Sequence, residues 1–166
     1  MDAFSVRTKI MIGGGMDALA QRLHRVFLVT DKFMAESGKT NYVTDRLLRN
    51  GGEFKIFSDV QADPDIATVT RGVEQILEFQ PDAVVAFGGG SPMDCAKAML
   101  EFGKKLGTGA DIRFVAVPTT AGTGSEVTSF AVLTDRAKGV KYPLVDDALL
   151  PDEAILDPSL LAGVPP

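Results

Sequence analysis

The chain contains few of the side chains that most often bind metals or form cross-links. It has one cysteine (Cys95), one histidine (His24) and no tryptophan among its 166 residues. A single cysteine excludes an intramolecular disulfide, which agrees with a reducing, cytoplasmic location. A cluster of histidine and cysteine ligands is excluded too, and no spacing indicates a metal site made of carboxylates alone. We expect Cys95 to be a small residue at a helix–sheet contact and His24 to lie at the surface, so we name no catalytic or metal-binding residue in this chain.

Long apolar runs and an excess of positive charge are also missing. No run approaches the roughly 20 residues needed to span a bilayer, and the N-terminus shows no pattern of a secretory signal. The 17 lysine and arginine residues are outnumbered by 22 aspartates and glutamates, which gives a net charge of −5. No basic run occurs, so neither a nucleic acid nor an anionic membrane surface is expected as a partner. The content of 45% hydrophobic and 23% charged residues is that of an ordinary globular protein.

The order of apolar and helix-like segments is the main signal for the fold. Four short apolar runs are predicted to be buried strands, at 25–30, 53–57, 83–87 and 112–117. Helix-like segments lie between them, at 32–49 with an interruption near Gly38, from 63 to about 79, and from about 92 to 105. A strand near 6–12 and a helix near 16–23 precede them, and short extended pieces follow at 128–134, 140–142 and 154–156. This alternation predicts a doubly wound α/β fold, in which helices cover both faces of a mainly parallel, Rossmann-like sheet.

Two of the predicted helices begin with recognisable capping residues. Asp63 is predicted to cap the N-terminus of one helix, with Pro64 as its first residue. Ser91 is predicted to cap the next, with Pro92 at the first position. Asp94 then falls at the third position, where a carboxylate interacts favourably with the helix dipole.

Three consecutive glycines, Gly88, Gly89 and Gly90, directly follow the predicted strand 83–87. In open parallel sheets, ligands bind at the carboxyl ends of the strands and near the N-termini of helices. Glycines allow backbone N–H groups to approach phosphate oxygens, so the turn is predicted to bind an anionic group of a ligand. A tight turn without a ligand is the alternative. The spacing matches neither GxxxxGK[ST] nor a GxGxxG on the first strand, so neither a P-loop NTPase nor a standard Rossmann fingerprint is indicated.

Two other strand ends carry polar residues suited to a nucleotide. Asp31 follows the strand 25–30 and can accept hydrogen bonds from ribose hydroxyls, although a helix N-cap is its simpler role. Lys141 is a cation that can meet phosphate or ribose oxygens, or a plain surface residue. The segment PTTAGTGSEVT at 118–128 offers the hydroxyl groups of Thr119, Thr120, Thr123 and Thr128. Together with the glycine turn, these strand-end loops predict a nucleotide site at one edge of the sheet.

Several motifs resemble the iron-containing (group III) alcohol dehydrogenase family. They are VTDKF at 29–33, GGGSPMDCAK at 88–97, PTTAGTGSEVT at 118–128 and the segment beginning KYPLVDDALLPD at 141–166. The segment GVKYPLVDDALLPD and the short spacing between Lys97 and Pro118 are most similar to the propanol and ethanol dehydrogenases of bacterial propanediol and ethanolamine utilisation. The resemblance implies that residues 1–166 form the dinucleotide-binding domain of a two-domain enzyme.

The resemblance also implies a role for each candidate site residue. Asp31 would bind the adenosine ribose and favour NAD over NADP, and Asp63 would help to close the adenine pocket. The glycine turn and Ser91 would contact the diphosphate, while Asp94 would lie near the nicotinamide amide. Lys141 would reach the ribose or phosphate on the nicotinamide side. The residues that would surround the diphosphate and ribose are Thr119, Thr120, Thr123 and Thr128.

The same resemblance implies chemistry that this chain does not complete. Members of the family bind a divalent metal, normally iron, through one aspartate and three histidines of a C-terminal helical domain. Those ligands begin shortly after a segment like the one at 164–166, and that domain is absent from this sequence. We therefore predict that the chain binds NAD(H) weakly and does not by itself interconvert alcohols and aldehydes.

Alternatives remain at the level of the sequence. A polyol dehydrogenase of the glycerol type is less favoured, because its glycine turn usually carries lysine at the position of Ser91. A non-catalytic nucleotide-binding or assembly module is an alternative of a different class, for which a missing metal site is no defect. The resemblance also leaves room for a homo-oligomer and for location inside a bacterial microcompartment.

Overall fold

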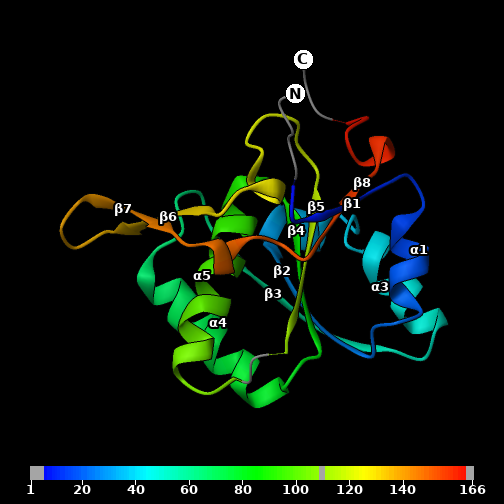
Figure 1. The fold of residues 1–166 in the computed structure, drawn as a ribbon, viewed down its shortest axis with the longest axis horizontal. Coiled ribbons are helices and arrows are strands. Elements are labelled where there is room, and N and C mark those ends of the chain that lie inside the picture. Colours follow the sequence, from blue (N-terminus) through cyan, green and yellow to red (C-terminus); the bar gives the residue numbers. More distant parts are fainter. Residues whose placement is uncertain (1–5, 109–110, 164–166) are drawn as a thin grey trace, which may run out of the picture.

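The computed structural model describes residues 6–108 and 111–163 of the chain (Figure 1). Two sequence-based interpretations fall outside these residues: the lack of a secretory signal at 1–5, and the junction with a metal-binding domain at 164–166. No helix in the described ranges combines the length and apolarity needed to cross a membrane.

A six-stranded sheet forms the centre of the molecule, with the strand order β1-β8-β5-β4-β2-β3. Its strands are β1 (Lys9–Ile12), β2 (Arg25–Asp31), β3 (Glu53–Val60), β4 (Ala83–Gly88), β5 (Arg113–Pro118) and β8 (Glu153–Leu156). Every neighbouring pair is parallel. All residues of the central strand β4 are buried, as expected for a parallel strand covered on both faces. The predicted parallel sheet is therefore confirmed.

Helices cover both faces of this sheet (Figure 1). They are α1 (Gly15–Ala20), α2 (Lys32–Glu36), α3 (Asn41–Arg49), α4 (Ile66–Phe79) and α5 (Gly90–Lys105). Apolar residues of α1 and α3, such as Leu19 and Leu47, belong to one core. Apolar residues of α4 and α5, such as Val73 and Met99, belong to the core on the opposite face. Burial of these two apolar faces against the sheet stabilises the doubly wound arrangement that the sequence predicts.

The helix-like segment 32–49 divides into α2 and α3, as predicted from Gly38. Gly38 has a φ of +76°, in the left-handed region that glycine adopts without a side-chain clash. The interruption lets the chain change direction between the two helices, and α3 then packs on the sheet.

The predicted start of α4 at Asp63 and Pro64 is wrong. The helix begins at Ile66, and its N-cap is Asp65, whose side chain accepts a hydrogen bond from the N–H of Thr68. Asp63 has a φ of +55° and lies outside the helix. Pro64 disfavours the helical conformation in the residue before it, and its own carbonyl accepts a hydrogen bond from Thr134 N at 2.9 Å. Pairing with another part of the chain therefore moves the helix start by two residues.

The last third of the chain contributes a hairpin and one strand of the main sheet. β6 (Phe130–Asp135) and β7 (Val140–Val145) pair antiparallel and project from one side of the molecule, at the left of Figure 1. Short 3-10 segments occur at Ser125–Val127 (η1), Asp147–Leu149 (η2) and Pro158–Leu160 (η3). β8 lies between β5 and β1 in the main sheet. The sequence pattern predicted β8 only as a short extended segment, without its position in the sheet.

Candidate functional site

The loops after β2, β4 and β5 lie at one edge of the sheet, because these strands are parallel neighbours. The chain leaves β2 toward the helices on one face and leaves β4 toward α5 on the other. This is the switch point of a doubly wound sheet, where a crevice for ligands opens. The structure thus brings together Asp31, the glycine turn and the threonine loop, which we define as residues 119–128.

The glycine turn leaves little room for side chains, least of all at Gly88. Gly88 has a φ of +140°, and a Cβ added to it would lie 2.9 Å from Pro92 Cγ. A Cβ on Gly89 would lie 3.4 Å from Thr120 Oγ1, and one on Gly90 would lie 3.0 Å from Thr123 Cγ2. The glycines therefore allow the threonine loop to approach the start of α5 closely.

The N-terminus of α5 has the properties of an anion site. This helix has 16 residues, its N-cap is Gly89, and within the described residues no side chain caps its first N–H groups. The helix dipole gives this end a partial positive charge, and glycine exposes the backbone donors. The first turn of α5 can therefore receive a phosphate group.

The predicted capping roles of Ser91 and Asp94 are wrong, because α5 begins at Gly90 rather than at Pro92. Gly89 occupies the N-cap position, so Ser91 lies inside the first turn of the helix. Asp94 lies one position beyond that turn. Its two carboxylate oxygens accept hydrogen bonds from Ser125 Oγ at 2.9 Å and from Val132 N at 3.1 Å. Burial raises the pKa of Asp94, and these two hydrogen bonds oppose the shift.

Thr119 supplies a buried polar group next to the glycine turn. Its backbone N–H donates to the carbonyl of Gly88 at 2.9 Å, and its side chain is only 3% exposed. Its Oγ1 has no hydrogen-bond partner among the described residues. A buried hydroxyl without a partner carries a cost, so this group fits a site that receives a polar ligand. Thr120 and Thr123 are exposed beside it.

Asp31 serves as an N-cap and also lies beside the glycine turn. Its Oδ1 accepts a hydrogen bond from Met34 N at 2.9 Å, which caps α2. Its Oδ2 lies 3.6 Å from the position of a Cβ on Gly88. The role of Asp31 as a helix N-cap is confirmed. It uses only Oδ1, so Oδ2 remains beside the glycine turn.

Asp63 and Lys141 form an ion pair at the hairpin side of the site. Lys141 Nζ lies 2.7 Å from Asp63 Oδ1, and both side chains are more than half exposed. A pair this exposed contributes little to stability. The two residues are therefore brought together by the fold and remain accessible to a ligand.

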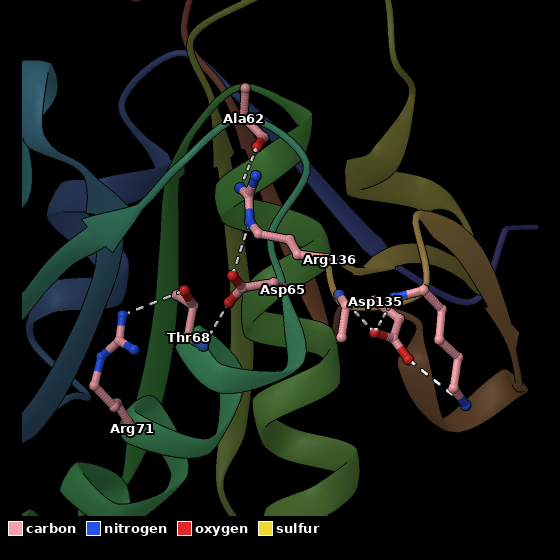
Figure 2. A network of polar contacts seen from close by, with 8 residues as sticks. Ala62, Asp65, Thr68, Arg71, Asp135 and Arg136 are labelled. Carbon is pink, nitrogen blue, oxygen red and sulfur yellow. Dashed lines mark hydrogen bonds and ion pairs between the residues drawn. The ribbon is translucent and has the colours of Figure 1, made fainter.

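Further contacts fix the hairpin to the loop after β3 (Figure 2). Arg136 Nε donates to Asp65 Oδ2 at 2.9 Å, and Arg136 also donates to the carbonyl of Ala62 at 3.5 Å. Asp65 at the same time caps α4 through the N–H of Thr68. One carboxylate thus connects a helix start to the hairpin.

Lys97 is a residue of the site region to which the sequence analysis gave no role. It lies on α5, is fully buried, and donates hydrogen bonds to the carbonyls of Thr128 and Phe130 and to the Thr128 hydroxyl. Thr128 is therefore engaged by the protein itself. Burial lowers the pKa of Lys97 to about 8. The available signal was a lysine within the otherwise apolar stretch CAKAML, at 95–100.

The described residues do not fit an iron site. In residues 6–108 and 111–163, no three His, Cys, Asp or Glu side chains lie close enough to hold a metal ion. His24 is exposed. Cys95 is fully buried in the core under α5, as expected, and burial raises the pKa of its thiol to about 12. A thiol in that state is a poor nucleophile.

Solved structures share this fold over nearly the whole chain. A sulfoacetaldehyde reductase from Bifidobacterium kashiwanohense, in complex with NAD+, has a TM-score of 0.84 and 35% identity. The match covers 99% of this chain and 48% of the reductase. An iron-containing alcohol dehydrogenase from Thermococcus thioreducens has a TM-score of 0.87 and 28% identity, with 98% of this chain and 48% of that one covered.

Sequence comparison gives the same relationship. The 1-propanol dehydrogenase PduQ of Citrobacter freundii is 44% identical over 168 aligned positions, which cover all of this chain and 45% of that protein. The chain thus spans about half the length of these relatives. The family model for "Iron-containing alcohol dehydrogenase" matches residues 8–158. The chain therefore belongs to the iron-containing alcohol dehydrogenase family.

Proposed function

We propose that this chain is the NAD(H)-binding part of a metal-dependent alcohol dehydrogenase that interconverts short primary alcohols and aldehydes. The observation that carries the proposal is the glycine turn at the N-terminus of α5, covered by the threonine loop and the unpartnered hydroxyl of Thr119. Two similar proteins support it: the structure of the similar reductase contains NAD+, and the similar PduQ is a 1-propanol dehydrogenase.

The residues around the turn match the parts of a dinucleotide. The turn and Ser91 would hold the diphosphate at the N-terminus of α5, with Thr119, Thr120 and Thr123 around it. The free oxygen of Asp31 would accept from ribose hydroxyls and would repel the 2′-phosphate of NADP. Asp63 and Lys141 would border the cofactor from the hairpin side.

Three of the candidate residues have narrower roles in this proposal. The carboxylate oxygens of Asp94 and the hydroxyl of Thr128 are both engaged within the protein. These two would therefore act on the nicotinamide side through the segments they hold, rather than by a free polar group. Gly88 would contribute through its backbone alone.

Bound NAD would accept a hydride, and a divalent metal such as iron would stabilise the alkoxide of the alcohol. The residues of this chain would bind and orient the cofactor, and in the described ranges no three side chains able to bind a metal lie together. The metal and much of the substrate pocket would therefore belong to a further part of the enzyme. Cytoplasmic or microcompartment location and self-association stay predictions.

A non-catalytic nucleotide-binding module is the second candidate, favoured only by the missing metal donors. The polyol alternative is less favoured because Ser91 stands where a lysine is usual. Both alternatives share the dinucleotide site, so binding is the first property to test.

Backbone amide NMR shifts during NAD and NADP titrations test the site directly. We expect NAD to shift the amides of Gly89, Gly90 and Ser91, with affinity in the range of about 0.1–10 mM, since the chain spans about half the length of its relatives. Asp31→Ser keeps a capping oxygen for α2 but removes the carboxylate. It should weaken NAD binding about tenfold, the value of a hydrogen bond to a charged group, and reduce the preference over NADP.

Glu36→Gln is the matched control, because it removes a negative charge from an exposed residue of the same helix. It should leave both affinities within about twofold, as usual for a surface change. Amides of the glycine turn that do not move at saturating NAD would contradict the proposal. A submicromolar affinity would contradict the picture of an incomplete site.

A further inference from the structure

The ammonium group of Lys97 is fully committed to the protein's own backbone. Its Nζ lies 2.8 Å from the carbonyl oxygens of both Thr128 and Phe130, and 3.3 Å from Thr128 Oγ1. An ammonium group has three N–H donors, and these acceptors use all of them. The side chain is 0% exposed. Lys97 is therefore not available to a cofactor phosphate.

Asp94 lies one helical turn before Lys97 and binds the same segment of chain. Residues three apart in a helix lie on one face, so the carboxylate and the ammonium point toward the same neighbour. Asp94 holds Ser125 and Val132, at 2.9 and 3.1 Å. Together, the two side chains attach residues 125–132 to α5 at four positions.

Between the two ends of the threonine loop, two hydrogen bonds are local: Ser125 N donates to Thr123 Oγ1 at 3.3 Å, and Val127 N donates to the carbonyl of Gly124 at 3.1 Å. At its start, Thr119 N donates to the carbonyl of Gly88. A Cβ added to Gly122 or Gly124 would meet no atom within 4 Å, so these positions are open. The exposed part of the loop therefore depends on the anchor at Thr119 and on the attachment to α5.

We propose that Lys97 is a positioning residue, which holds the threonine loop against the glycine turn by binding the backbone of Thr128 and Phe130. The benefit to NAD rests on the proposed function, whereas the attachment of the loop is a property of the chain itself. Lys97 thus acts on the cofactor through the loop and does not touch it.

The charge of Lys97 gives this attachment a pH dependence. Burial lowers the pKa of Lys97 from 10.5 to about 8, and the carboxylates of Asp94 and Glu126 oppose the shift. Asp65 and Arg71, on the α4 side, act on the neighbouring Cys95 instead. An open loop would return Lys97 to water and to its ordinary pKa. The closed state then binds fewer protons, so closure becomes more favourable as the pH rises from about 8 toward 10.5.

A neutral amine can maintain the closed arrangement. It keeps two N–H donors, one for each of the two carbonyl oxygens, and it can accept a hydrogen bond from the Thr128 hydroxyl. Deprotonation removes the charge that burial disfavours and preserves the attachment.

Hydrogen exchange of the 166-residue chain without NAD tests the attachment. In Lys97→Met, protection factors of the amides in 120–132 should fall about tenfold or more, since each bond to a charged donor contributes roughly that much. Lys104→Met, an exposed lysine of the same helix, should stay within about twofold. If the protection factors in Lys97→Met also stay within about twofold of the unmodified chain, as in Lys104→Met, the proposal is overturned.

A second measurement needs no variant and stands even if Lys97→Met fails to fold. In the unmodified chain, protection factors of 125–132, corrected for intrinsic exchange, should rise severalfold between pH 7 and 9, while those of α4 should not. Protection that falls over this range, so that the attachment is lost together with the proton, overturns the proposal. Where Lys97→Met folds, its protection should lack this rise.

NAD titration separates this inference from the proposed function. If NAD does not shift the amides of the glycine turn, the proposed function is contradicted. The exchange results on the free chain still decide the role of Lys97. A Lys97→Met variant with a loosened loop and unchanged NAD affinity overturns the positioning role.

Discussion

At the scale of single residues, position 88 has two constraints that only glycine satisfies together. Its φ of +140° is rare for residues with a side chain, and a Cβ would approach Pro92 Cγ to 2.9 Å. Asp31 at the end of β2 lies beside the same position, with its Oδ2 3.6 Å from that Cβ. The glycine therefore determines both the backbone path and the access to the helix N-terminus.

Gly88→Ala should lower the free energy of unfolding by about 1–3 kcal/mol, the usual cost of a strained backbone. Gly122→Ala should change it by less than about 0.5 kcal/mol, because that position has open space and no positive φ. Urea unfolding followed by circular dichroism measures both. Equal stability of the two variants would contradict the steric role of Gly88.

The candidate residues also show what sequence patterns can tell about single side chains. Asp31 and the glycines lie where their position after a strand predicts, because the ends of parallel strands share one edge. The neighbours of Asp94 and Lys97 could not be predicted, since they lie 31 to 38 residues away along the chain. The spacing of residues within one helix predicts on which face of the helix a side chain lies, but it does not predict which residue that side chain contacts.

At the scale of the element, the start of α4 depends on a choice between two aspartates. Asp63 and Asp65 flank Pro64, and both can cap a helix. Asp65 takes the role because the hairpin also binds it, through Arg136 and a bridge to Thr134. The backbone hydrogen bond from Thr68, followed by Arg136, lowers the pKa of Asp65.

Asp65→Ala should cost about 0.5–2 kcal/mol of stability at neutral pH, as for the loss of an N-cap. The folded-state pKa is lowered, so the contribution of the carboxylate is present above the ordinary value of 3.8 and is lost as the pH falls through the folded value. Thermal unfolding at pH 7 and near pH 2 measures this: the difference from the unmodified chain should shrink at the lower pH.

Asp63→Asn is the control for that prediction, because asparagine tolerates the left-handed backbone of Asp63 and removes only an exposed ion pair. It should change stability by less than about 1 kcal/mol. A larger loss from Asp63→Asn than from Asp65→Ala would show that the cap is assigned to the wrong aspartate.

At the scale of the whole molecule, the chain spans about half the length of its relatives. The described residues contain the proposed cofactor site, and no cluster of metal donors occurs among them. Hydride transfer from an alcohol requires that the hydroxyl proton be lost, and in this family a metal is expected to make that loss favourable.

The isolated chain should therefore show no NAD-dependent oxidation of 1-propanol, with or without added Fe²⁺ or Zn²⁺. NADH absorbance measures the reaction, and a full-length member of the family serves as the positive control. Turnover above that of the metal ions alone would contradict the proposal that the metal is bound outside these residues.

Local signals in the sequence predict the architecture, which the structure confirms, and they predict where the candidate site lies. Apolar strands, helix periodicity and glycine turns are local signals, and parallel strands carry their C-terminal loops to one edge. The family motifs are local as well, and the family match over 8–158 agrees with them.

Only the tertiary structure decided how the loops around that site are held. The insertion of β8 beside β5, the pair of Asp63 with Lys141, and the burial of Lys97 join residues 31 to 78 positions apart. Such contacts depend on which surfaces meet after the sheet has formed. Their energy comes from burying and pairing groups that the sequence leaves independent, so no local pattern reveals them.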